Sequence, residues 1–62
     1  MMDIDQVTRI AQQLNIKLTA AEEGTDLYRC WADRVEDAWN AWRRGDANRC
    51  REMIEDANRY AV

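Results

Sequence analysis

The sequence contains no histidine, serine or proline, and only two of its 62 residues are cysteines. Without histidine, the chain lacks the most common metal ligand and the most common general base in proteins. Cys30 and Cys50 cannot by themselves complete a tetrahedral Cys/His zinc site. A serine nucleophile and a glycine-rich phosphate loop are also missing. We therefore expect no enzyme activity, no catalytic residue, no metal site and no cofactor.

Positive charge is scarce, because nine basic residues face twelve acidic ones and the net charge is −3. Eight of the nine bases are arginines, and Lys17 is the only lysine. Proteins that bind nucleic acid usually present a basic surface to the phosphates. The balance argues against a nucleic-acid partner.

Long apolar runs are absent too. No stretch approaches the roughly 20 apolar residues that a membrane-spanning helix needs. The N-terminal residues MMDIDQ have neither the basic region nor the apolar core of a secretory signal. We expect a cytoplasmic protein that does not enter a membrane and keeps its thiols reduced.

The length allows one domain, residues 1–62. Chains below roughly 70–80 residues usually need disulfides, a metal or a partner subunit to be stable. Since the composition disfavours a metal, association with another chain is the form of help that remains open.

The absence of proline suits a helical chain, and the apolar spacing predicts three helices. The first should span about residues 3–15, with Asp3 as its N-cap. Its apolar face comprises Ile4, Val7, Ile10, Ala11 and Leu14. In the connector, residues 16–25, Thr19 and Glu22 have the spacing of a capping box, which predicts a short helical turn. Gly24 either ends this turn or lies within a longer helix.

The other two helices should span about residues 26–44 and 46–60. Gly45 fits the position that follows a helix, and Asp46 can cap the next one. So short a connection predicts an antiparallel hairpin. The expected fold is therefore all-α: a short N-terminal helix packed on an antiparallel helical hairpin, a small helical bundle completed by dimerisation.

The hairpin separates the two cysteines. Folding about Gly45 places Cys50 opposite residues near 40 and Cys30 opposite residues near 60, which is roughly 15 Å apart along the axis. A disulfide requires Cα atoms within about 7 Å of each other. We expect two free and largely buried thiols that act as small apolar core residues.

The helix at residues 26–44 has an apolar arc of about 200°, more than one neighbouring helix can cover. One side of the arc is mostly small: Leu27, Cys30, Ala38 and Ala41. The other side is large: Tyr28, Trp31, Val35, Trp39 and Trp42, with Ala32 beside them. We expect the third helix on the small side and the first helix over part of the large side. The outer edge at Tyr28, Ala32 and Trp39 should stay exposed in a monomer, which is typical of an interface.

Arg34 lies inside the same apolar arc. A buried arginine is rare unless it is paired. Its head can reach a carboxylate of the third helix, Glu52 or Asp56. Alternatively, Arg34 binds an acidic group of a partner or a phosphate.

The stretch AWNAWRRGDANRCREMIEDA is similar to the turn region of a tetratricopeptide repeat. The matching positions are Gly45, Asp46, Cys50, Ile54 and Ala57, whereas Ala47 stands where a tyrosine is expected. The resemblance implies hairpin geometry only, because a solenoid needs about three stacked repeats.

The stretch VTRIAQQLNIKLTAAEEG resembles the helix-turn-helix motif of DNA-binding regulators. Ile10, Ala11 and Leu14 match its core positions, and the turn would be Asn15-Ile16. The resemblance implies a recognition helix from about Leu18 onward. Its acidic residues would repel the DNA backbone, whereas recognition helices need groups that reach bases and phosphates.

These observations favour a small protein-binding or regulatory protein that forms a homodimer and acts by occupying a surface of a partner protein. In its size and acidity it resembles the small inhibitors that phages and mobile elements encode. The expected apolar contacts are Tyr28, Ala32, Val35 and Trp39, and the expected polar contacts are Arg34, Arg43 and Arg44. A helix-turn-helix DNA-binding regulator (residues 7–24) and a ligand-sequestering oligomer are the alternatives.

Overall fold

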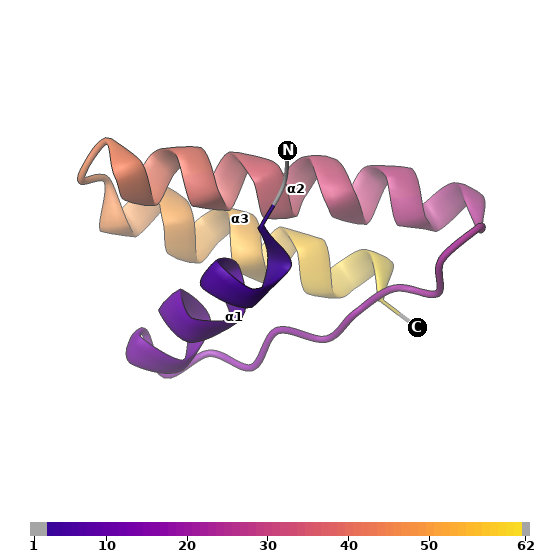
Figure 1. Cartoon of the computed structure of the whole chain (residues 1–62), viewed down its shortest axis with the longest axis horizontal. Helices are drawn as coiled ribbons and strands as arrows, with labels where there is room; N and C mark the ends of the chain where they lie inside the picture. Colours follow the sequence, from indigo (N-terminus) through magenta and orange to yellow (C-terminus); the bar gives the residue numbers. More distant parts are fainter. Residues whose placement is uncertain (1–2, 62) are drawn as a thin grey trace.

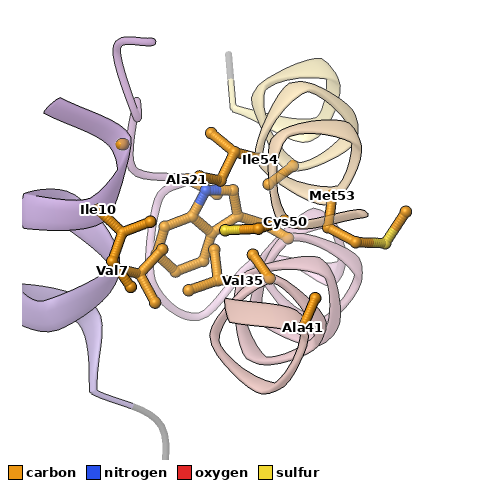
Figure 2. Packing of buried hydrophobic residues seen from close by; sticks show 12 residues of the cluster. Val7, Ile10, Ala21, Val35, Ala41, Cys50, Met53 and Ile54 are labelled. Atoms are coloured by element: carbon orange, nitrogen blue, oxygen red, sulfur yellow. The ribbon is translucent and has the colours of Figure 1, made fainter. Parts of the chain in front are cut away.

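The computed structural model describes residues 3–61, which form three α-helices joined by a long connector and a tight turn (Figure 1). The helices are α1 (Ile4–Gln13), α2 (Asp26–Arg43) and α3 (Ala47–Tyr60). Helices α2 and α3 pack closely side by side as an antiparallel hairpin. Helix α1 crosses this hairpin with its N-terminal end on the α2 side and its C-terminal end on the α3 side (Figure 1, Figure 2). The expected all-α hairpin architecture is confirmed.

Local capping explains where the hairpin helices begin and end. Thr25 caps α2, because its side-chain oxygen accepts a hydrogen bond from the Tyr28 N–H. After α2, Gly45 adopts a φ of 84°, and the N–H groups of Gly45 and Asp46 donate to carbonyls of the last helical turn. This is a Schellman ending, which favours glycine because a positive φ strains other residues. Asp46 then caps α3 through the Arg49 N–H, as predicted.

Helix α1 begins and ends in a similar way. Asp3 is its N-cap and accepts a hydrogen bond from the Gln6 N–H. At the other end Asn15 takes a φ of 62°, and the Ile16 N–H donates to the Ala11 carbonyl. Asparagine tolerates this left-handed conformation better than most residues do, so the helix stops here.

The core lies where the three helices meet (Figure 2), and its largest fully buried side chain is Trp31 of α2. Only 1% of the Trp31 surface is exposed. The other buried residues of the helices are those of α1 (Val7, Ile10, Ala11), of α2 (Val35, Ala38, Ala41) and of α3 (Cys50, Met53, Ile54, Ala57). Small residues at Ala38, Ala41 and Ala57 let the hairpin helices approach closely.

The connector between α1 and α2 is extended and runs along the hairpin (Figure 1). Ile16 and Leu18 pack against the core, whereas Lys17 and Thr19, which alternate with them, are exposed. This alternation is that of an extended chain, in which successive side chains point to opposite faces. The prediction of a short helical turn starting at Thr19 was therefore wrong.

Side chains of the hairpin hold the connector. The Asn58 amide donates to the Lys17 carbonyl at 2.6 Å and accepts from the Thr19 N–H at 2.9 Å. The Trp31 indole N–H donates to the Thr19 carbonyl at 2.9 Å. Both backbone groups of Thr19 are therefore engaged, and a helix starting there would break both hydrogen bonds. Gly24, with a φ of 89°, lies in the turn before α2 and not inside a helix.

The extended connector also argues against the helix-turn-helix alternative. That resemblance required a second helix from about Leu18, but residues 16–22 contain no helix. The expected recognition helix is therefore missing from the place where the motif would put it.

The two cysteines are free, as predicted, but only one is buried. Cys50 is fully enclosed, and Cys30 is exposed, so the expectation of two buried thiols was wrong. Cys30 lies in the second turn of α2. Burial raises the pKa of the Cys50 thiol, and the Asp46 carboxylate raises it further.

This difference predicts unequal thiol reactivity. The thiolate is the reactive species, so burial and a raised pKa both slow the reaction of Cys50. In the native protein at about pH 8, Ellman's reagent should modify one thiol per chain within minutes, and the second only after denaturant is added. A Cys30→Ala variant should lose the fast phase entirely. Equal rates for both thiols would contradict the burial of Cys50.

Candidate protein-binding surface

The outer edge of α2 carries most of the side chains that the sequence analysis selected for binding. We define the α2 edge as Tyr28, Ala32, Trp39 and Arg43, which follow one another at spacings of four, seven and four residues. Such spacings keep the side chains on one stripe of a helix. Tyr28, Ala32 and Trp39 are partly exposed, and Arg43 is exposed. None of the three apolar residues is fully enclosed by the chain itself.

Val35 was predicted to belong to this edge, and the structure corrects that. Its exposure is 0%, and it lies in the core where α1 meets the hairpin (Figure 2). On a helical wheel Val35 lies about 40° from Trp39, toward the side that α1 covers. That small rotation separates a core residue from an edge residue.

The edge residues are held by their own neighbours. The Tyr28 ring lies against Trp31, with 5.4 Å between the ring centroids. The guanidinium carbon of Arg43 lies 5.9 Å from the centroid of the Trp39 ring, within cation–π range. Trp39 therefore presents a partly exposed indole with a positive charge beside it, and Trp and Arg are both enriched at interfaces.

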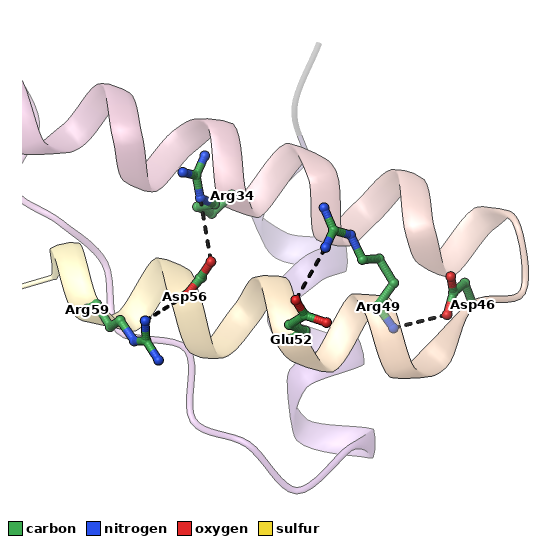
Figure 3. A network of polar contacts seen from close by, with 6 residues as sticks. All are labelled: Arg34, Asp46, Arg49, Glu52, Asp56 and Arg59. Atoms are coloured by element: carbon green, nitrogen blue, oxygen red, sulfur yellow. Dashed lines mark hydrogen bonds and ion pairs between the residues drawn. The ribbon is translucent and has the colours of Figure 1, made fainter.

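Arg34 has its partners within the same chain (Figure 3). Its Nε lies 3.8 Å from a carboxylate oxygen of Asp56, and its guanidinium carbon lies 5.8 Å from the Tyr60 ring centroid. The predicted pairing with Asp56 is confirmed, whereas Glu52 pairs with Arg49. With about a third of each side chain exposed, the Arg34–Asp56 pair stabilises the fold by at most about 1 kcal/mol. Because it is already paired, Arg34 gives no support to a ligand-sequestering site.

Charges are unevenly placed along α2. Asp33, Glu36 and Asp37 are exposed near its middle, and Arg43 and Arg44 are exposed at its C-terminal end. The ion pairs within residues 3–61 are Arg34–Asp56, Arg49–Glu52 and Arg59–Asp56. The acidic and basic groups on the outer face of α2 are therefore unpaired and available to another molecule.

Within residues 3–61, the exposed large apolar residues are Leu27 and Ile4, at 46% and 36%. Sequence reasoning placed both in covered positions. Leu27 stays open because α2 has 18 residues and α3 has 14, so the first turn of α2 extends past the end of its partner. The two expected helix lengths, 19 and 15 residues, already differed by four residues, and comparing them could have predicted that Leu27 is exposed.

Other features of the surface are weaker candidates for a binding site. A shallow depression of about 390 Å³ lies at the end of α1, lined by Gln12, Asn15, Ile16 and Lys17. It holds a single charged group and does not touch the α2 edge. Within residues 3–61 there is no cluster of three potential metal ligands, and no helix combines the length and apolar character needed to cross a membrane.

Comparisons of the chain with known protein families, with curated proteins and with solved structures found no match.

Proposed function

We propose that this chain is a small protein-binding module that acts by occupying a surface of another protein chain through the α2 edge. The observation that carries the proposal is Trp39, a large aromatic side chain that packs against the core but stays partly exposed on the α2 edge. Trp, Tyr and Arg are the residue types enriched at the energetic centres of protein interfaces.

The shape of the edge supports the same function. From Tyr28 to Arg43 it runs for about 22 Å along a single helix. A straight helical edge with partly exposed rings suits contact with another helix or a shallow groove, in which aromatic side chains act as anchors. The charged groups beside it can set orientation and specificity.

The proposed location is the cytoplasm. Cys30 supports it, because an exposed free thiol persists in a reducing compartment and is prone to oxidation elsewhere.

The test is capture of binding proteins from a lysate of the source organism, quantified by mass spectrometry. Trp39→Ala should lose the proteins that the wild type retains, since removing a central aromatic anchor commonly costs about 2 kcal/mol or more of binding energy. Leu27→Ala is the matched control, because it removes an exposed apolar side chain from a different face of α2. Circular dichroism checks that both variants stay folded. Identical capture by Trp39→Ala and the wild type would contradict the proposal.

A further inference from the structure

We infer that the partner of the α2 edge is a second copy of this chain, packed antiparallel along α2 with Trp39 near the twofold axis and Arg43 against Glu36 of the second copy. The inference rests on the proposed function, since it uses the same edge, and it adds the identity and orientation of the partner.

The order of charges around Trp39 carries the argument. Glu36 lies three residues before Trp39, and Arg43 lies four residues after it. Seven residues are nearly two helical turns, so both charges lie on one stripe about 10 Å apart, on opposite sides of the indole. Both side chains are exposed, and neither belongs to the ion pairs found within residues 3–61.

Such an arrangement is complementary to itself in one direction only. In a parallel pair Glu36 would face Glu36 and Arg43 would face Arg43, and like charges repel. In an antiparallel pair centred near Trp39, each Glu36 faces an Arg43, which gives two ion pairs related by the twofold axis. A twofold interface requires a surface that complements itself in this way.

The apolar residues fit the same arrangement. Centring the pair near Trp39 brings the two indoles together and shields them from water, and aromatic pairs are favourable contacts. Ala32 lies two turns before Trp39 and faces the turn after α2 and the start of α3 in the second copy, where its small side chain leaves room for them. A chain of 62 residues also gains from such an interface, because small domains are often stabilised by association.

An acidic segment of an unrelated protein is the competing occupant, since it could meet Arg43 and Arg44. It would leave Glu36 unpaired beside the contact. The second copy uses both charges, so the observations favour it.

Sedimentation equilibrium of the full chain, from about 1 to 500 µM in low salt, tests the inference. The wild type should show a monomer–dimer equilibrium. Arg43→Glu and Glu36→Arg should each raise the dimer dissociation constant at least tenfold. The double variant, with both charges exchanged, should return to within about threefold of the wild type. Glu55→Arg, the same change of charge on the exposed face of α3, should leave the dimer intact.

Circular dichroism excludes unfolding as the cause of any loss. A wild type that is monomeric across the whole range overturns the inference, and so does a dimer that the single charge reversals leave unchanged. A monomer that still captures another protein through Trp39 would overturn this inference and leave the proposed function standing.

Discussion

A Trp31→Ala variant should be largely unfolded at 25 °C. Trp31 is 1% exposed, belongs to the buried cluster that joins α1 to the hairpin, and donates a hydrogen bond to the Thr19 carbonyl of the connector. Replacing a buried tryptophan by alanine typically costs about 3–5 kcal/mol of folding free energy. A single core in a domain of this size rarely supplies more than about 3–5 kcal/mol, so the variant should have little stability left. Far-UV circular dichroism with urea titration measures the loss directly.

Two control variants should give smaller losses than Trp31→Ala. Trp31→Phe keeps an aromatic ring in the core but removes the N–H that donates to the Thr19 carbonyl, and should cost about 1–3 kcal/mol because that carbonyl loses a partner. Trp42→Ala removes an indole that is only partly buried and should cost less than Trp31→Ala. The central role of Trp31 is contradicted if Trp31→Ala unfolds at the same urea concentration as the wild type.

Local signals in the sequence predicted most of the fold. Helix ends are governed by groups within a few residues, so Asp3, Gly45 and Asp46 could be assigned from their neighbours alone. The antiparallel hairpin followed from the short turn at Gly45. The hairpin left Glu52 and Asp56 as possible partners of Arg34, and the structure selects Asp56, which lies as far from Gly45 as Arg34 does.

The connector could not be predicted in this way. A capping-box spacing at Thr19 and Glu22 is a local signal, but the backbone of Thr19 is held by Asn58 and Trp31, which are 39 and 12 residues away. Hydrogen bonds between distant residues outweighed a local preference. Asn58 was one weak indication in the sequence that α3 holds another segment. It is a polar amide that directly follows Ala57, a residue of the apolar face of α3.

The candidate site was predicted in part for a similar reason. The helical wheel grouped Val35 with Trp39, and only the position of α1 separates them. That position depends on long-range contacts, including the hydrogen bond from Arg51 of α3 to the Leu14 carbonyl at the end of α1. Periodicity shows which face of a helix is apolar, but it does not show how far a crossing helix extends over that face.

Asn58→Asp should release the connector while leaving the hairpin folded. The amide of Asn58 both donates to the Lys17 carbonyl and accepts from the Thr19 N–H. A carboxylate has the same shape but cannot donate, so it would set two oxygens against each other at the 2.6 Å contact with Lys17. Since these groups are partly exposed, we expect a loss of about 1–2 kcal/mol in the free energy of unfolding.

Lys17 supplies a direct readout of that release. Trypsin cleaves after lysine, and cleavage requires the surrounding backbone to leave the surface that holds it. In Asn58→Asp the cut after Lys17 should therefore become several-fold faster, while cuts within the hairpin change less. Asn48→Asp, at an exposed position on α3, is the matched control and should be cleaved like the wild type. If both variants are cut after Lys17 at the same rate, the Trp31 indole and the packing of Ile16 and Leu18 suffice to hold the connector, and the amide contributes little.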